Sequence, residues 1–270
     1  MKWVLQNNIY EEEGFARLLT ALERRGCDIV HVKVVPFVGD LEAVQGELPS
    51  GGGEAIVMGS YTLSRVARDR GWRPGSFLDN LDFRVQLEHW GTKMLNSDAL
   101  VCRFDEVPFQ EKPFFLRPVH DTKAFTGLVL DWGQYTQWVD GLLRCPELAD
   151  PVYDPLGVNL LTLATPVMVC SKKEIYSETR FWVVDGRVIT SSGYKVGTLK
   201  RYREPWETDH RMTDFVEDLL WRPNEAHVID IAETPDGYKI IEVNNLNSAG
   251  WYKADVDRLV EFLSLRPNRR

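Results

Sequence analysis

The sequence predicts a mixed α/β (α+β) fold, and three observations support this prediction. Residues 2–70 alternate short apolar runs with one-sided helical patterns, in the order strand, helix, strand, strand, helix. That order is typical of a small α/β unit with a parallel sheet. Residues 178–190 read as two strands joined by Asp185-Gly186, a strong signal for a hairpin. Residues 228–243 read as a second hairpin, because the turn residues TPDG separate two β-branched runs.

The first 80 residues contain the α/β unit. Its strands are expected at Lys2–Leu5, Asp28–Val35 and Ala55–Met58, and its helices at Glu11–Gly26 and Tyr61–Arg70. Ser60 precedes the second helix and suits an N-cap. A helix N-terminus that follows a strand can also hold an anion, so both uses of Ser60 stay open here.

The remaining residues alternate strands, helices and loops without internal repeats. Apart from the two hairpins, strands are expected at Phe114–Leu116 and Pro166–Cys170, and helices at Phe83–Leu95, Trp132–Leu143, Thr213–Trp221 and Ala254–Leu265. Residues 120–127 are polar and residues 149–157 are rich in proline and aspartate, so both read as loops.

Composition places the chain among soluble globular proteins. Its 270 residues suffice for a sizeable core, and 44% hydrophobic with 27% charged residues is ordinary for this class. A formal net charge of −8 argues against a nucleic-acid partner. No run approaches the roughly 20 apolar residues that cross a bilayer, and the N-terminus lacks the apolar run of a signal peptide. Four scattered cysteines without metal-ligand spacing indicate reduced thiols, so we expect a cytoplasmic protein.

The second hairpin concentrates polar side chains on one face. Side chains alternate along a strand, so the sequence predicts one apolar face and one mixed face. The apolar face comprises Ile229, Ile231, Ile241 and Val243, and the mixed face comprises Asp230, Ala232, Ile240, Glu242 and Asn244. If the pairing is symmetric about Asp236, Asp230 lies opposite Glu242, and Asn244 follows on the same face.

The facing carboxylates indicate a cation site. Two carboxylates placed this close repel each other unless a cation or a proton lies between them. Mg²⁺ accepts a few protein oxygens and completes its octahedron with water and phosphates, so Asp230, Glu242 and Asn244 are candidate magnesium ligands. The alternative is a solvent-facing strand edge whose acids only keep the protein soluble.

Several motifs follow one another in a characteristic order along the chain. They are a basic residue before proline at Arg117, a hinge strand at 166–170, an acid-x-Arg hairpin at Glu178 and Arg180, and an aspartate followed by Glu-x-Asn at Asp230 and 242–244. As a set they resemble the ATP-grasp superfamily, in particular a compact, uncharacterised bacterial and phage subgroup that is carboxylate–amine ligase-like. The resemblance runs from about Phe83 to Trp251.

The resemblance also implies a domain organisation. Residues 1–80 would form a small N-terminal α/β domain of the pre-ATP-grasp type, and residues 81–270 would form the ATP-grasp domain. Within the latter, residues 81–165 would be the central subdomain and residues 166–270 the C-terminal subdomain that binds metal and ATP.

The resemblance assigns a role to each candidate site residue. The implied ATP contacts are Arg117 and Lys123 on the phosphates, the backbone of Met168, Val169 and Cys170 on adenine, and Glu178 on the ribose hydroxyls. The implied catalytic cations, directed toward phosphate and acyl substrate, are Arg180 and Lys195. Asp230, Glu242 and Asn244 would hold one or two Mg²⁺ ions. Asn245, Asn247 and Ser248 would contact the acceptor substrate or the γ-phosphate.

Two features depart from the family pattern, and several residues have a plainer alternative. Arg117 replaces the usual lysine, although arginine also binds phosphate bidentately. The phosphate-covering loop is not rich in glycine and offers only Gly127. Alternatively, Arg117 pairs with a surface acid and Lys123 is a solvated loop lysine. Glu178 and Arg180 can likewise form a cross-strand ion pair, which contributes little when exposed, and Lys195 has a similar alternative.

The implied activity is that of an ATP- and Mg²⁺-dependent carboxylate–amine ligase. Such an enzyme forms a C–N bond through an acylphosphate and releases ADP and phosphate, and its partners are small-molecule or peptide carboxylates and amines. Phosphoryl transfer needs positioning and cations rather than a protein nucleophile, and the sequence contains no nucleophile motif of the usual classes. Two alternatives are an ATP-grasp kinase acting on a hydroxyl and a nucleotide-binding module without turnover.

Overall fold

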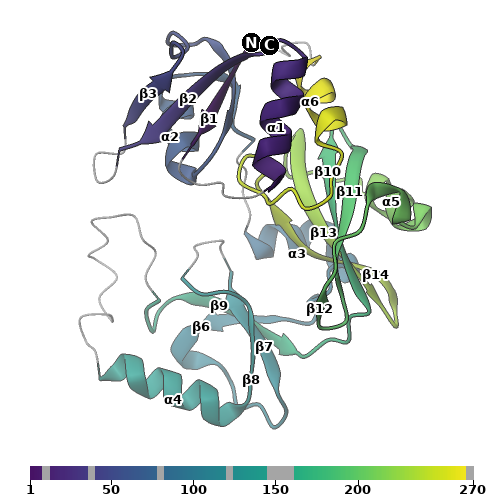
Figure 1. The fold of residues 1–270 in the computed structure, drawn as a ribbon. Coiled ribbons are helices and arrows are strands. Elements are labelled where there is room, and N and C mark those ends of the chain that lie inside the picture. The colour runs from purple at the N-terminus through teal and green to yellow at the C-terminus, as the bar shows by residue number, and fades with distance from the viewer. Residues whose placement is uncertain (8–12, 36–39, 78–81, 120–123, 145–160, 266–270) are drawn as a thin grey trace. The chain divides into compact units, whose positions relative to one another are not determined.

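The computed structural model describes residues 1–7, 13–35, 40–77, 82–119, 124–144 and 161–265 (Figure 1). The chain divides into two compact units. The first comprises Met1–Asp79 together with Ile175–Arg270, and the second comprises Asn80–Glu174. Two segments far apart in the sequence therefore fold together in the first unit.

The first unit begins with a five-stranded sheet of order β3-β2-β1-β4-β5. Its strands are β1 (Lys2–Gln6), β2 (Asp28–Val34), β3 (Leu41–Gln45), β4 (Glu54–Met58) and β5 (Arg73–Gly75), with helices α1 (Glu13–Arg24) and α2 (Tyr61–Asp69). Strand β1 runs parallel to β2 and β4, which confirms the predicted parallel sheet. Strands β3 and β5 were not predicted, because β3 is largely exposed and β5 has only three residues.

Ser60 is the N-cap of α2. Its hydroxyl accepts a hydrogen bond from the Leu63 N–H at 3.4 Å, so the capping interpretation is confirmed. The Gln6 side-chain oxygen accepts hydrogen bonds from both the backbone N–H and the hydroxyl of Ser60, at 3.0 and 2.9 Å.

The first unit also contains an antiparallel sheet of order β12-β11-β10-β13-β14. Its strands are β10 (Ser177–Val184), β11 (Arg187–Val196), β12 (Leu199–Lys200), β13 (Ala226–Thr234) and β14 (Gly237–Asn244), with helices α5 (His210–Glu217) and α6 (Val256–Ser264). Both predicted hairpins are confirmed. Asp185 and Gly186 have φ values of 51° and 78°, the positive pair that a type I′ turn requires.

Three β-bulges in this antiparallel sheet interrupt the regular alternation of side chains. On the β13–β14 pair, Asp230 lies opposite Glu242 as predicted, but Ile231 lies opposite Ile240, so Ile241 is the extra residue. Ile240 was therefore wrongly assigned to the mixed face, and it is fully buried with Ile231. On the β10–β11 pair, the extra residues are Tyr194 and Ile189. A bulge redirects side chains locally and is frequent beside active sites.

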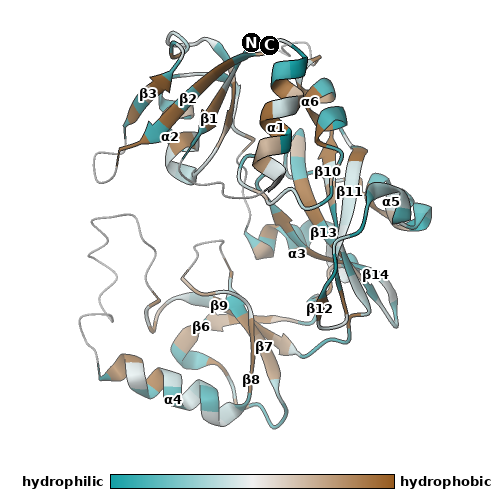
Figure 2. Cartoon of the chain, in the orientation of Figure 1, coloured by the Kyte–Doolittle hydropathy of each residue, from teal (hydrophilic) through white to brown (hydrophobic). Residues whose placement is uncertain are grey.

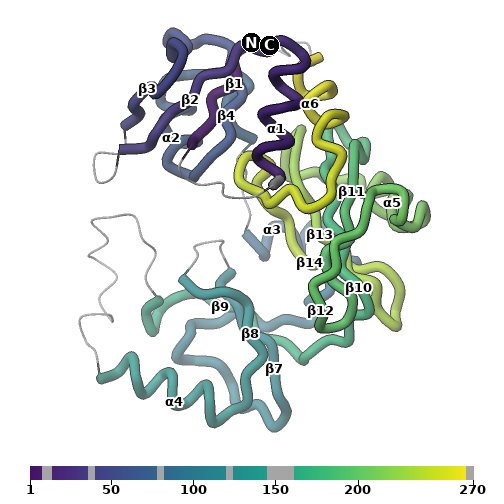
Figure 3. The backbone as a smooth tube through the Cα atoms, in the orientation of Figure 1, coloured from purple at the N-terminus to yellow at the C-terminus, as the bar shows by residue number. Residues whose placement is uncertain are grey.

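One hydrophobic core joins the two sheets of the first unit. Its larger members include Trp3, Leu5, Leu18, Leu22, Ile56, Met58, Trp182, Val228, Trp251 and Leu259. Helices α1 and α6 lie side by side (Figures 1 and 3), and Arg25, the residue after α1, pairs with Asp257 of α6 at 2.7 Å. Strand β2 of the N-terminal sheet is hydrophobic over most of its length, whereas α5 is largely hydrophilic (Figure 2).

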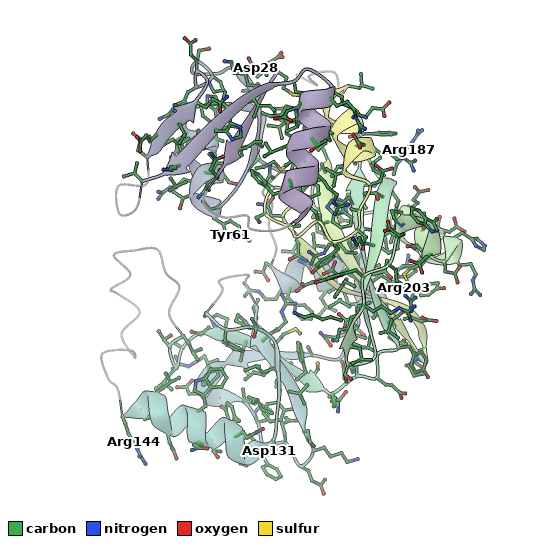
Figure 4. The ribbon with its side chains drawn as sticks, in the orientation of Figure 1. Asp28, Tyr61, Asp131, Arg144, Arg187 and Arg203 are labelled. Carbon is green, nitrogen blue, oxygen red and sulfur yellow. The ribbon has the colours of Figure 1, made fainter. Side chains whose placement is uncertain are left out.

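The second unit is built on an antiparallel sheet of order β6-β9-β7-β8. Its strands are β6 (Leu100–Arg103), β7 (Phe114–Pro118), β8 (Leu128–Leu130) and β9 (Pro166–Ser171), with helices α3 (Phe83–Trp90) and α4 (Trp132–Leu143). Phe104, Phe114, Leu116, Tyr135, Val167 and Val169 belong to its core. Asp131 caps the N-terminus of α4 through the Gln134 N–H, and Arg144 lies at its C-terminus (Figure 4).

Helix ends differ from the predicted ones for local reasons. Helix α3 ends at Trp90 rather than Leu95, because Gly91 has a φ of 49° and ends the helical run. Helix α5 begins at His210, where the Asp209 carboxylate accepts a hydrogen bond from the Arg211 N–H at 2.9 Å. Short 3₁₀ turns span Gly91–Lys93, Phe104–Glu106 and Pro205–Glu207. None of the helices in the described ranges is long and apolar enough to span a bilayer.

Candidate active site

A network of charged and polar side chains covers one face of the antiparallel sheet in the first unit. Glu178 and Arg180 lie two residues apart on β10, so they point to the same face. Arg180 is paired in register with Asp230 of β13, and Asp230 with Glu242 of β14. The register of three adjacent strands therefore brings together residues that are about 60 positions apart in the sequence.

The central contact of this network is a bidentate ion pair between Arg180 and Asp230. Arg180 Nε donates to Asp230 Oδ1 and Nη2 donates to Oδ2, both at 2.8 Å. The two side chains are only 9% and 1% exposed. Burial alone lowers the pKa of Arg180, but the adjacent Asp230 carboxylate outweighs burial and raises it above its usual value. The guanidinium is therefore permanently charged, and it compensates the buried carboxylate.

Asn244 links the two carboxylates that were predicted to bind metal. Its Nδ2 lies 3.3 Å from Asp230 Oδ2 and 3.2 Å from Glu242 Oε1, so one amide N–H₂ group donates to both. The three side chains thus converge on one point, where the amide supplies the positive dipole that two close carboxylates require.

The donor set at this point fits a magnesium ion. Two carboxylates and an amide oxygen are hard oxygen ligands of the kind Mg²⁺ takes, and rotation of the Asn244 amide would turn its oxygen toward the same point. Asp230 keeps acceptor sites beyond its two bonds to Arg180, since an ionised carboxylate has about four lone-pair sites. Within the described part of the chain, no group of three His, Cys, Asp or Glu side chains could hold a metal ion. The site at Asp230 has only two such side chains, and its third donor is the Asn244 amide.

Glu178 is bound by two neighbours on β11. Lys195 Nζ lies 2.5 Å from its Oε1, and the Tyr194 hydroxyl donates to its Oε2 at 2.7 Å. Consecutive residues of a regular strand point to opposite faces, so both contacts are made possible by the bulge at Tyr194. Burial, with the nearby Asp230 and Glu178 carboxylates, raises the pKa of the Tyr194 hydroxyl, which therefore stays protonated and donates.

A stack of tyrosines lies against Arg180. The Tyr252 ring stacks with those of Tyr194 and Tyr202, with centroid distances of 5.2 and 5.1 Å. The Arg180 guanidinium carbon lies 4.9 Å from the Tyr252 ring centroid and 5.7 Å from that of Tyr194. Sequence reasoning missed these tyrosines, because no local spacing relates position 252 to positions 194 and 202.

The three residues predicted to contact the acceptor substrate occupy different environments. Asn247 is buried and engaged by the backbone, since its side chain bonds to the Phe77 N–H at 2.7 Å and to the Val57 carbonyl. Asn245 is also buried, and its Nδ2 has no hydrogen-bond partner within the described ranges. Ser248 is exposed. The contacts of Asn247 are those of a structural residue that joins the loop after β14 to the N-terminal sheet.

The remaining predicted ATP contacts belong to the second unit. Arg117 lies on β7 and is paired in register with Met168 of β9. Strand β9 is central, with β6 on one side and β7 on the other, so the backbone of Met168 and Val169 faces partner strands on both sides. Cys170 is buried, and burial raises the pKa of its thiol to about 11. Lys123 lies outside the described residues.

Comparisons with known proteins agree with the predicted family. The profile "ATP-grasp domain, R2K clade family 3" matches residues 50–263. No curated protein matches the chain in sequence. A RimK domain ATP-grasp protein from Sphaerobacter thermophilus has a similar crystal structure, with 15% identity, a TM-score of 0.64, and coverage of 98% of this chain and 100% of that one.

Two further crystal structures share the fold. The D-cycloserine synthetase DcsG is 12% identical, with a TM-score of 0.59, over 97% of this chain and 98% of that one. The macrocyclase MdnC from Microcystis aeruginosa, bound with precursor peptide MdnA, is 12% identical with a TM-score of 0.58, over 98% and 100% of the two chains. Since the family profile covers most of its length, the chain belongs to the ATP-grasp family, R2K clade family 3, and has the ATP-grasp fold.

Proposed function

We propose that the protein is an ATP- and Mg²⁺-dependent ligase that joins a carboxylate to an amine. The observation that carries this proposal is the convergence of Asp230, Glu242 and Asn244 beside the buried Arg180. Membership of the ATP-grasp family supports the use of ATP. Proteins of the same fold include the D-cycloserine synthetase and macrocyclase described above and a D-alanine–D-alanine ligase from Bacillus anthracis, 10% identical with a TM-score of 0.55.

The proposed reaction has two balanced steps. A carboxylate oxygen of the acyl substrate attacks the γ-phosphorus of ATP, and ADP leaves with the electrons of the broken P–O bond. The amine nitrogen then attacks the acyl carbon of the acylphosphate, inorganic phosphate leaves, and the amine loses one proton. Bound Mg²⁺ would neutralise phosphate charge during the transfer.

The residues of the first unit have distinct tasks in this proposal. Asp230, Glu242 and Asn244 would hold the metal. Arg180, kept in place by Asp230, and Lys195 would neutralise the acyl and phosphoryl oxygens. Glu178 would accept hydrogen bonds from the ribose hydroxyls. Its carboxylate retains acceptor sites while Lys195 and Tyr194 donate to it. Asn245, whose Nδ2 has no hydrogen-bond partner among the described residues, is a better candidate than Asn247 for contact with the acceptor.

The second unit would supply the other nucleotide contacts. Arg117 and Lys123 are proposed for the phosphates. For adenine we extend the predicted segment Met168–Cys170 to the main chain just beyond it, because β9 ends at Ser171 and residues 172–174 have no strand partner.

Trapping with hydroxylamine tests the first step without knowledge of the amine. Hydroxylamine converts an acylphosphate into a hydroxamate, so pools of amino acids and peptides can be screened for hydroxamate with equimolar ADP. Glu242→Gln should lower ADP formation by about 10²–10³-fold, by analogy with loss of one transition-state donor. Glu42→Gln is the matched control, because Glu42 is exposed on β3. ADP formation that is equal in both variants would overturn the metal assignment.

One observation favours a nucleotide-binding module without turnover. Both proposed catalytic cations are already paired, Arg180 with Asp230 and Lys195 with Glu178. A module of this kind would be stabilised by ATP and Mg²⁺ and would form no ADP with any acyl pool. A kinase on the same fold would instead form ADP with a hydroxyl substrate and yield no hydroxamate.

A further inference from the structure

Tyr252 has an unusual backbone conformation. Its φ is 45°, and among the described residues other than glycine only Asp185 shares a positive value. Asp185 is explained by its type I′ turn, but Tyr252 lies in the loop between β14 and α6. The left-handed region is uncommon for a bulky residue, and such conformations persist where the surrounding structure imposes them.

Helix α1 supplies the groups that hold this conformation. Arg17 donates hydrogen bonds to the backbone carbonyls of Tyr252 and, at 2.9 Å, of Ala254. Three residues earlier on α1, Gly14 approaches Trp251 so closely that an added Cβ would lie 2.5 Å from the Trp251 Cβ. Helix α1 therefore contacts the Trp251 side chain just before Tyr252 and the backbone carbonyls of Tyr252 and Ala254.

The consequence of this conformation is the position of the Tyr252 ring. The ring stacks with Tyr194 and with Tyr202, and its centroid lies 4.9 Å from the Arg180 guanidinium carbon, compared with 5.7 Å for Tyr194. The Asp230 carboxylate holds Arg180 Nε and Nη2, whereas Nη1 has only a 3.4 Å contact with the Gly250 carbonyl. The tyrosine rings thus restrict the guanidinium on a side that Asp230 leaves open.

We propose that Tyr252 is a positioning residue for Arg180, and that Arg17 and Gly14 of α1 set its conformation. Arg17 and Gly14 precede residue 50, so they lie outside the part of the chain that the family profile matches. The order that Tyr252 imposes on Arg180 follows from the contacts alone. Its effect on turnover rests on the proposed ligase function.

Substitutions at Tyr252 separate the ring from the hydroxyl. Tyr252→Phe keeps the stack and the cation–π contact, so it should retain turnover within about twofold. Tyr252→Leu removes the aromatic face and should lower kcat about tenfold, since a partly buried cation–π contact is worth about one factor of ten. The KM for ATP should change less than twofold in both variants. An equal loss of kcat in both variants would overturn the positioning role. A loss of kcat/KM that arises from a higher KM would overturn it too.

Variants in α1 test the remote part of the proposal. Arg17→Met should lower kcat in the same way as Tyr252→Leu, and the double variant should be no slower than Tyr252→Leu alone, because both act through one ring. Gly14→Ala should behave like Arg17→Met. Its control is Gly141→Ala in α4, where an added Cβ meets nothing within 4 Å. Additive losses in the Arg17–Tyr252 double variant would overturn the link to α1.

An NMR measurement that needs no turnover distinguishes the positioning role of Tyr252 from the proposed ligase function. In protein labelled with ¹⁵N-arginine, the Arg180 Nε–H signal is assigned by its absence from Arg180→Lys. This signal should show backbone-like rigidity in the wild type and in Tyr252→Phe, and nanosecond mobility in Tyr252→Leu. If the wild type forms no ADP, the ligase proposal fails while this comparison still decides the inference. An equally rigid signal in Tyr252→Leu would overturn it.

Discussion

Arg180 and Asp230 form a bidentate ion pair on adjacent strands of one sheet, with both nitrogen–oxygen distances at 2.8 Å. The pair is nearly excluded from water, so each charge depends on the other for compensation. Asp230 at the same time faces Asn244 and Glu242. One carboxylate therefore connects the buried cation to the proposed metal ligands.

Asp230→Asn should destabilise the protein strongly. It leaves the Arg180 charge buried and unpaired, which typically costs about 3–5 kcal/mol of the free energy of unfolding. Urea unfolding measures this change. The control is Asp28→Asn, which removes an exposed partner of Lys2 at 3.4 Å (Figure 4 labels Asp28) and should cost less than about 1 kcal/mol. Similar losses in the two variants would contradict the interpretation of Arg180–Asp230 as a buried pair.

Asn244→Asp should make stability depend steeply on magnesium. The substitution replaces the donor that links Asp230 and Glu242 by a third carboxylate, so the metal-free protein should lose stability through repulsion. Mg²⁺ should restore it, and a ligand at 100 times its Kd adds about 2.7 kcal/mol. Thermal unfolding with Mg²⁺ or with EDTA measures both effects. A midpoint that does not respond to Mg²⁺ would remove these three residues as metal ligands.

Asn247→Ala should act on stability rather than on substrate affinity. It leaves the buried Phe77 N–H and Val57 carbonyl without this side chain, and an unsatisfied buried group costs about 1–3 kcal/mol. Ser248→Ala, at an exposed position, should change the free energy of unfolding by less than about 0.5 kcal/mol. If Asn247→Ala unfolds like the wild type and raises the KM of an acceptor substrate, the original assignment of Asn247 to substrate binding is correct.

His227 should make the protein less stable at acidic pH. Burial lowers its pKa from 6.5 to about 4, although its Nδ1–H donates to the Asn224 carbonyl at 3.1 Å. Between pH 6.5 and 4 the unfolded state binds this proton and the folded state does not, so the free energy of unfolding falls as the pH falls. The total for this residue is about 3 kcal/mol.

The difference between wild type and His227→Gln isolates this contribution. In urea unfolding, the wild type should lose more stability than His227→Gln between pH 6.5 and 4, and the two should run parallel above pH 7. His210→Gln is the control, because the His210 side chain is 85% exposed. If the free energy of unfolding falls with the same slope against pH in the wild type and in His227→Gln, the prediction is refuted.

Local signals predicted much of the fold. The Asp185-Gly186 turn and the TPDG turn specified both hairpins. The second turn pairs Thr234 with Gly237, and the bulge at Ile241 then brings Asp230 opposite Glu242. The prediction failed where a bulge intervened, as at Ile240, because one extra residue shifts every side chain beyond it to the other face. No residue in the sequence marks Ile241 as the bulged position.

Long-range contacts of the site were not predictable in the same way. The sequence indicated that Glu178, Arg180, Lys195 and Asp230 belong together, but not that Arg180 pairs with Asp230 and Glu178 with Lys195. The pairing depends on β13 lying next to β10, although a long stretch of chain separates the two strands. The hydrogen bonds of Asn247 to Val57 and Phe77 were likewise not predictable, because position along the chain does not reveal these contacts.

The amino-acid sequence alone determined the family, the two hairpins and the acids on a common strand pair, because turn chemistry and side-chain alternation act over a few residues. Only the tertiary structure decided which charges neutralise each other, which asparagine bonds to the distant residues Val57 and Phe77, and which groups of α1 contact the backbone at Tyr252. Those relationships join residues up to about 240 positions apart, as between Arg17 and Tyr252, and they exist only after distant strands and helices have packed into one core.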